Sequence, residues 1–76
     1  MREQILDILE TICPDVDFEK ETKLIDDSIL DSFAVIQIVT ELMESFDVFI
    51  DADDIEPENL NSLEAICDMV QEKLNS

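Results

Sequence analysis

The run from Ser32 to Phe46 constrains the fold of this chain most, because it contains no proline and its apolar residues recur at helical spacing. We predict one helix with an apolar stripe and a flanking set of apolar residues. The stripe consists of Phe33, Ile36, Val39, Met43 and Phe46, and the flanking set of Val35, Ile38 and Leu42. Because this arc is wider than one neighbouring helix covers, the helix is expected to be central in a bundle or partly reserved for a partner. Ile36 and Phe46 are expected in the core.

Two further helices are predicted on either side of this run. Helical spacing of apolar residues extends over residues 2–12, and Pro14 cannot continue that helix. The same spacing recurs from Ser62 to Leu74, where Asn61 or Ser62 is available as the N-cap. The acidic residues from 51 to 58 leave room for at most a short helical turn. Since the chain has no glycine, they are interpreted as solvated surface and not as a calcium loop.

Residues 15–30 are predicted to form a long ordered loop between the first two helices. They show no sustained period, and we expect their apolar side chains to hold the loop on the core: Val16, Phe18, Leu24, Ile25, Ile29 and Leu30. A loop of this length is uncommon in a compact domain unless it is functional. It leads to Asp31, a good N-cap at the positive end of the helix dipole, and to Ser32, whose hydroxyl lies at the helix N-terminus.

Size and charge restrict the possible functions. Seventy-six residues are enough for one domain, residues 1–76, with one core. A net charge of −17 repels nucleic acid and anionic lipid, and it attracts proteins that carry Lys/Arg patches. The start of the chain is unlike a signal peptide, and no apolar run is long enough to span a bilayer. We therefore expect a cytoplasmic monomer that does not insert into membranes.

The sequence offers little chemistry for catalysis. Cys13 and Cys67 are widely spaced among apolar residues and are expected to be buried thiols, not a disulfide or a metal site. Because the chain has no histidine, it has few residues that could form a zinc site or a catalytic triad. Asp31 is a weak proton acceptor for a hydroxyl, so Ser32 has no activating base of its own. The chain is therefore not expected to be an enzyme or to bind a metal, and Ser32 is expected to be a substrate.

The whole pattern resembles the acyl carrier protein family and is also similar to D-alanine carrier proteins. The likeness covers nearly the full chain: a first helix, a long loop, Asp-Ser opening a second helix, an acidic turn and a final helix. Its most specific stretch is Leu30-Asp31-Ser32-Phe33, followed in register by Val39, Leu42, Glu44, Phe46, Asp47 and Ile50. Two departures are that Phe33 stands where the family motif has leucine, and that Ser28 and Ile29 occupy a region that often holds glycine.

This resemblance implies an all-α four-helix bundle with three longer helices, one short helix and a long loop between the first two. It implies that Ser32 is esterified by 4′-phosphopantetheine, donated by coenzyme A through an Mg²⁺-dependent phosphopantetheinyl transferase that Asp31 helps to position. The arm would hold acyl or aminoacyl groups as thioesters for loading ligases and downstream enzymes with basic patches. The residues expected to contact such partners are Phe33, Val35, Ile36, Glu41, Met43 and Glu44.

Three questions remain open at the level of sequence. The cargo can be a fatty acyl, polyketide or peptide intermediate, or D-alanine. Val35, Met43 and Phe49 can belong either to the core or to a partner surface. The alternative to a carrier is an acidic helical interaction module that has the same fold and is not modified.

Overall fold

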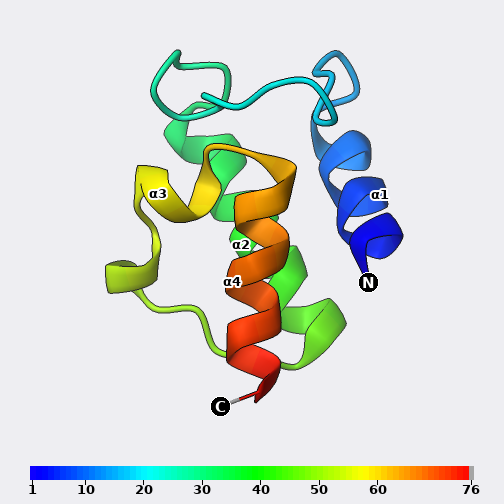
Figure 1. Ribbon diagram of the computed structural model, residues 1–76, viewed down its shortest axis with the longest axis vertical. Coiled ribbons are helices and arrows are strands. Elements are labelled where there is room, and N and C mark those ends of the chain that lie inside the picture. The colour runs from blue at the N-terminus through cyan, green and yellow to red at the C-terminus, as the bar shows by residue number, and fades with distance from the viewer. Residues whose placement is uncertain (76) are drawn as a thin grey trace.

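The computed structural model describes residues 1–75 and shows an all-helical bundle (Figure 1). Within these residues there are four α-helices: α1 (Arg2–Ile12), α2 (Ser32–Phe46), α3 (Pro57–Leu60) and α4 (Leu63–Asn75). A 3₁₀-helix, η1 (Ala52–Asp54), precedes α3. The predicted fold of three longer helices and one short one is confirmed. The predicted helix ends agree to within one residue.

The helix boundaries have local causes. The amide of Cys13 donates to the Leu9 carbonyl at 2.8 Å, and Pro14 follows, so α1 ends at Ile12. Asp47 ends α2 in the left-handed region, with φ 53°, a conformation in which glycine is the commonest residue. Ser62 caps α4, since its Oγ accepts a hydrogen bond from the Ala65 amide at 3.1 Å. Of the two predicted caps, Ser62 is therefore the one used.

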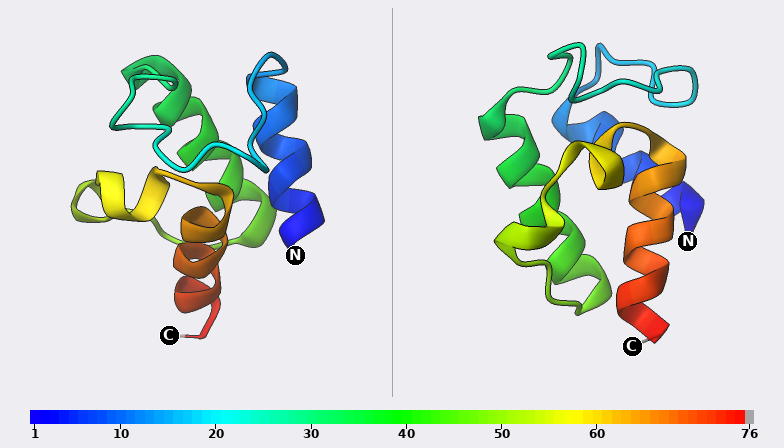
Figure 2. Two further views of the ribbon diagram at one scale, coloured as in Figure 1. Left: turned by 45° about the horizontal axis from the view of Figure 1, so that its top comes forward. Right: turned by 60° about the vertical axis from the view of Figure 1, so that its left-hand side comes forward.

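One apolar core lies between α1, α2 and α4, with the long loop closing one end of the bundle (Figures 1 and 2). Helix α1 packs against α2 and α4, and α3 leads directly into α4. All buried side chains in the described part are hydrophobic. The buried set comprises Ile5, Leu9, Phe18, Leu24, Leu30, Val35, Ile38, Val39, Leu42, Ile50, Leu60, Leu63, Ile66, Cys67, Met69 and Val70.

The long loop is fixed to the bundle in two ways. Phe18, Leu24 and Leu30 are buried in the core, while Val16, Ile25 and Ile29 pack against it in part. Asn61, at the junction of α3 and α4, accepts the Leu24 amide on its carbonyl at 2.8 Å. Its Oδ1 also accepts the Ile25 amide at 2.9 Å. The predicted ordered loop is confirmed, and its end before Ser32 has a defined position.

The structure corrects the predicted register of α2. The buried residues are Val35, Ile38, Val39 and Leu42, whereas Phe33 is 71% and Ile36 60% exposed. Met43 and Phe46 are only partly buried. The prediction that Ile36 belongs to the core is therefore wrong. The apolar arc is wider than the surface that α1, α4 and the loop cover. The side of the arc that carries Phe33 and Ile36 therefore remains in solvent.

Candidate functional site at the start of helix α2

Ser32 is the first residue of α2, and both Ser32 and Asp31 are exposed. Asp31 caps the helix as predicted: its Oδ1 accepts the Ala34 amide at 2.8 Å and its carbonyl accepts the Val35 amide at 3.0 Å. These bonds fix the first turn. The Ser32 hydroxyl is therefore presented to solvent from a rigid helix start.

The segment before Ser32 is held by its backbone. Leu30 is buried and donates its amide to the Leu24 carbonyl at 3.0 Å. Ser28 adopts φ 57°, in the left-handed region that glycine enters at lower cost. Ser28 lies in the region where the family often has glycine, and the turn is made here without it. The missing glycine therefore does not prevent the loop from reaching Ser32.

No activating group is arranged around Ser32. Within residues 1–75 the Ser32 hydroxyl forms no hydrogen bond to another protein group, and the chain has no histidine. The same residues contain no group of three or more cysteine, aspartate and glutamate side chains that could hold a metal ion. What the geometry offers is an accessible hydroxyl, available to a reaction that another protein activates.

Two open grooves adjoin this helix start. The α1–α2 groove, of about 710 Å³, lies between those helices and is lined by Asp7, Ile8, Thr11, Ile12, Phe33, Ile36, Gln37, Thr40 and Glu41. The α2–α3 groove, of about 340 Å³, includes Ser32 itself. Its other walls are Ile25, Leu30, Asp31, Val35, Ile36, Ile55, Glu56, Pro57 and Leu60. Ser32 thus lies at the edge of a mainly apolar surface.

The residues predicted to contact partners divide into three groups. Phe33, Ile36 and Glu41 are exposed and line the α1–α2 groove, and Glu44 is exposed on the same helix. Met43 is partly buried against the core. Val35 is only 9% exposed and belongs to the core cluster. The prediction that Val35 contacts partners is therefore corrected, because an isolated chain offers little of this side chain to another protein.

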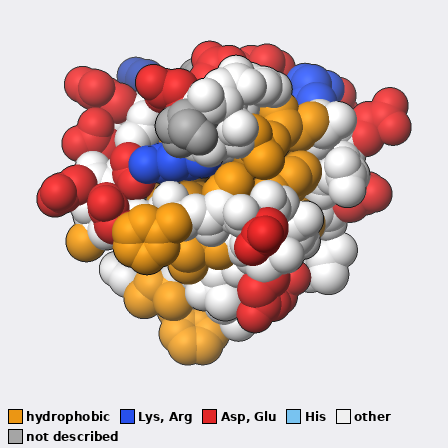
Figure 3. Space-filling view, turned by 90° about the horizontal axis from the view of Figure 1, so that it is seen from below, with side chains coloured by type: hydrophobic (Ala, Val, Ile, Leu, Met, Phe, Trp, Pro, Cys, Tyr) orange, Lys and Arg blue, Asp and Glu red, His pale blue; other side chains and the backbone are white. Residues whose placement is uncertain are grey.

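Phe49 has the opposite outcome to Val35. It is 72% exposed, because its neighbours Val48 and Ile50 turn toward the core and the chain alternates between inside and outside at this point. Figure 3 shows the end of the molecule where α2 and α4 finish, with hydrophobic side chains at the surface and acidic ones around them. Phe49 is therefore surface and not core.

Curated proteins similar to this chain are D-alanyl carrier proteins. One from Lactococcus lactis subsp. cremoris (strain MG1363) is 36% identical over 75 residues, which are 96% of this chain and 95% of that protein. One from Bacillus cereus (strain B4264) is 40% identical over 58 residues, 72% of each chain. The chain belongs to the D-alanyl carrier protein family. It is a carrier protein, and the resemblance predicted from its sequence is confirmed.

No protein-family model matches the chain, and no solved structure matches it significantly. Within residues 1–75, no helix combines the length and the hydropathy needed to cross a bilayer.

Both cysteines of this D-alanyl carrier family member are free thiols. Burial raises the pKa of the Cys67 thiol, and the Glu64 carboxylate raises it further. Burial, followed by the charge of Asp31, raises the pKa of the Cys13 thiol. Cys67 is buried as predicted, whereas Cys13 is only partly buried, because it lies just beyond the end of α1. Both thiols remain protonated at neutral pH and are poor nucleophiles.

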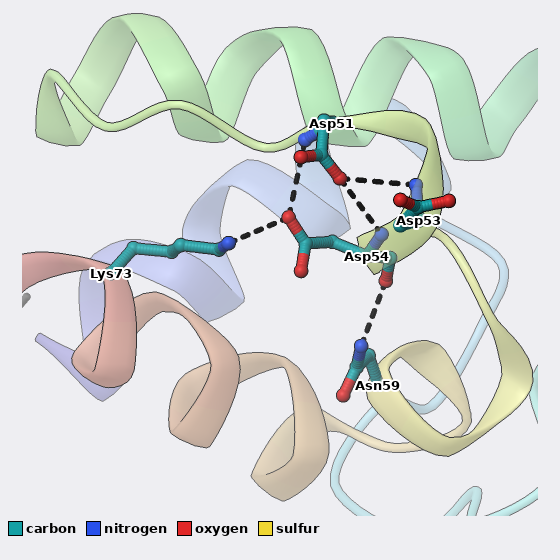
Figure 4. A network of polar contacts seen from close by, with 5 residues as sticks. All are labelled: Asp51, Asp53, Asp54, Asn59 and Lys73. Atoms are coloured by element: carbon teal, nitrogen blue, oxygen red, sulfur yellow. Dashed lines mark hydrogen bonds and ion pairs between the residues drawn. The ribbon is translucent and has the colours of Figure 1, made fainter.

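The acidic residues from 51 to 58, predicted to be solvated surface, include a network of hydrogen bonds and one ion pair. Asp51 caps η1, since its Oδ1 accepts the amides of Asp53 and Asp54 at 3.0 and 3.3 Å (Figure 4). Asp54 Oδ2 accepts the Asp51 amide at 3.2 Å and pairs with Lys73 Nζ at 2.6 Å. Asn59 donates to the Asp54 carbonyl at 2.8 Å. The network ties η1 to α3 and to α4. The Asp51-x-x-Asp54 spacing is the sequence signal that indicates the capping box of η1.

Proposed function

We propose that this protein carries D-alanine as a thioester on a 4′-phosphopantetheine arm esterified to Ser32. The observation that carries the proposal is the exposed hydroxyl of Ser32 at the capped start of α2, in the Asp-Ser motif. The names of the relatives support D-alanine as the cargo. When bound, the arm supplies a terminal thiol that holds the carboxyl group of the cargo as a thioester.

The residues around Ser32 fit a phosphate-linked group. The first turn of a helix has N–H groups without intrahelical partners, and with the dipole they favour an anion. The α2–α3 groove offers apolar surface next to the hydroxyl. Asp31 and Glu56 line the same groove and repel a phosphate. The transferase therefore has to supply cations, and we propose that Asp31 helps to position its Mg²⁺ and coenzyme A.

Ser32 takes part in the modification as a nucleophile only when a base of the transferase removes its proton. Its Oγ then forms a bond to the phosphorus that carries the pantetheine portion of coenzyme A. The phosphoanhydride bond to the adenosine portion breaks, and that portion leaves with the electron pair. This division of labour agrees with a hydroxyl that has no base of its own.

The structure supports a small cargo. A fatty acyl chain is protected by a cavity between helices, but Ile5, Leu9 and Leu42 have no exposed surface and belong to one buried core cluster. The grooves beside Ser32 and Phe33 are open to solvent. An amino acid with a charged ammonium group remains in water without penalty. We therefore propose an aminoacyl cargo over a long acyl chain.

The proposed partners are a phosphopantetheinyl transferase, a ligase that loads the amino acid, and an enzyme that receives it. With a net charge of −17, the chain attracts enzymes with basic patches and speeds their encounter. Glu41 and Glu44 are exposed on α2 and suited to such contacts. We propose a cytoplasmic monomer, since free thiols such as Cys13 and Cys67 persist in reducing compartments.

The test is to incubate the unmodified protein with coenzyme A, Mg²⁺ and several broad-specificity transferases, and to measure its intact mass. We expect one phosphopantetheine on the native chain and on Ser45→Ala, which removes another exposed serine of α2, and none on Ser32→Ala. No addition by any transferase, or equal addition to Ser32→Ala, would support an unmodified interaction module instead. Loading of D-alanine in preference to L-alanine and palmitate by the cognate ligase then tests the cargo.

A further inference from the structure

Asn61 joins the long loop to the junction of α3 and α4, which the loop passes in Figure 2. Its amide donates to the Pro57 carbonyl at 2.9 Å, and its own carbonyl accepts the Leu24 amide at 2.8 Å. Its Oδ1 accepts the amides of Ile25 and Asp26 at 2.9 and 3.1 Å. Its Nδ2 donates to Asp26 Oδ2 at 3.1 Å. One partly buried residue thus binds three consecutive amides of the loop.

These bonds reach the residues directly before Ser32. Leu24 is fully buried, so its amide has no water to bind and needs the Asn61 carbonyl. The Leu24 carbonyl in turn accepts the Leu30 amide at 3.0 Å. Leu30 is buried and immediately precedes Asp31, the N-cap of α2. A displacement of the loop at Asn61 is therefore passed on to the turn that presents Ser32.

Asn61 also adjoins two walls of the α2–α3 groove, which includes Ser32. Ile25 lines this groove from the loop, while Pro57 and Leu60 line it from α3. Asn61 is hydrogen-bonded to both Ile25 and Pro57. It also follows Leu60 directly in the chain. The position of the loop wall relative to the α3 wall therefore depends on this one residue.

We propose that Asn61 is a positioning residue for the modification of Ser32, because its hydrogen bonds hold the loop wall and the α3 wall of the α2–α3 groove in the arrangement that the transferase accepts. This inference rests on the proposed function. Without the Asn61 side chain, the chain spends less time in the accepted arrangement. The apparent KM for the carrier then rises by the inverse of the remaining fraction, while kcat at saturation is unchanged.

The first measurement uses the unmodified chain and does not depend on the transferase. Amide hydrogen exchange and amide chemical shifts are compared in the native chain, Asn61→Ala and Ser62→Ala. Ser62→Ala is the matched control, because Ser62 is the next residue and its Oγ bonds only within α4, to the Ala65 amide. In Asn61→Ala, the Ile25 and Asp26 amides should exchange about tenfold faster, and the shifts of residues 31–33 should change. In Ser62→Ala, both observables should stay close to native.

The second measurement is the initial rate of phosphopantetheine addition at increasing carrier concentration, at a temperature well below each variant's melting transition. Asn61→Ala should raise the apparent KM about tenfold and leave kcat within about twofold. Ser62→Ala should leave both within about twofold. A purely structural role would lower the melting temperature in both variants without this separation of KM from kcat.

A pair of substitutions tests the contact itself. Asn61→Asp keeps an oxygen for the two loop amides but places a carboxylate against Asp26, so it should raise KM. Asp26→Asn alone keeps an acceptor for Asn61 Nδ2 and should have a native KM. The double variant restores the bond with donor and acceptor exchanged, and its KM should return to within about twofold of native.

The proposal is overturned by equal changes of KM in Asn61→Ala and Ser62→Ala, by a loss in kcat alone, or by native exchange at Ile25 and Asp26. If Asn61→Ala does not fold, the double variant replaces it, and a KM that stays as high as in Asn61→Asp overturns the proposal. An unmodified native chain would instead remove the carrier function. Normal modification of the native chain with a native KM in Asn61→Ala removes the positioning role alone.

Discussion

Asp31 is expected to have two separable roles, one in stability and one in modification. Its Oδ1 accepts the Ala34 amide at 2.8 Å at the start of α2. Removal of such a cap costs about 1 kcal/mol, within a range of roughly 0.5 to 2 kcal/mol. For a domain of this size, 1 kcal/mol lowers the melting temperature by about 4–8 °C. We therefore expect Asp31→Ala to melt several degrees below the native chain.

Asp31→Asn separates the two roles, because an asparagine side-chain oxygen can still cap the helix while the charge is lost. The lost interaction with the helix dipole is worth about 0.3–1 kcal/mol at an exposed site. Relief of repulsion in a chain of net charge −17 offsets part of it. We expect the unfolding free energy of Asp31→Asn to lie within about 0.5 kcal/mol of the native value. We also expect this variant to accept phosphopantetheine more slowly, because the carboxylate is missing.

The assays are urea unfolding followed by circular dichroism, and the initial rate of mass increase with coenzyme A and a transferase. Ser62→Ala is the matched control, since it removes the cap of α4, at 3.1 Å from the Ala65 amide, far along the chain from Ser32. It should lose about as much stability as Asp31→Ala without a slower modification. If Asp31→Asn is as unstable as Asp31→Ala, the capping argument is wrong. If Asp31→Asn is modified at the native rate, the Asp31 carboxylate does not help to position the transferase.

Three further predictions test the packing, the ion pair and the loop. Ile38→Ala should cost about 2–5 kcal/mol of unfolding free energy because Ile38 is buried, and Ile36→Ala less than about 0.5 kcal/mol; equal losses in urea unfolding would contradict the register of α2. Lys73 lowers the pKa of Asp54, so the stability advantage of the native chain over Asp54→Asn should be present at neutral pH and vanish as the pH falls through that lowered pKa. An advantage that persists in strong acid would show that the pair is not its source. Ser28→Gly should raise the unfolding free energy by up to about 1 kcal/mol and Ser28→Val should lower it, since φ is 57° there; the opposite order of melting temperatures would refute the strain.

The sequence predicted the helices well because their ends depend on neighbouring residues. Pro14 stops α1, and Asp31 caps α2 through a side chain three residues from its partner amide. The same local logic placed Ser32 at an exposed helix start. Features of this kind need no knowledge of the rest of the fold.

The register of α2 could not be obtained in this way. Nine apolar residues give that helix an arc wide enough for several burial patterns, and only the positions of α1, α4 and the loop decide which part is covered. This is why Ile36 was placed in the core although it is exposed. The contacts of Asn61 with the loop at Ile25 and of Asp54 with Lys73 join residues far apart in sequence, so no local pattern indicates their pairing.

The exposed side of α2 has a consequence for how a carrier of this size can distinguish its enzymes. Every buried side chain in residues 1–75 belongs to the core, so recognition has to use exposed side chains. Uniform acidity alone attracts any basic protein and screens away with salt. Phe33 and Ile36 add an apolar contact with a fixed position beside the hydroxyl, which charge cannot provide. Their exposure costs the folded chain buried area, and we propose that another protein covers this part of the helix.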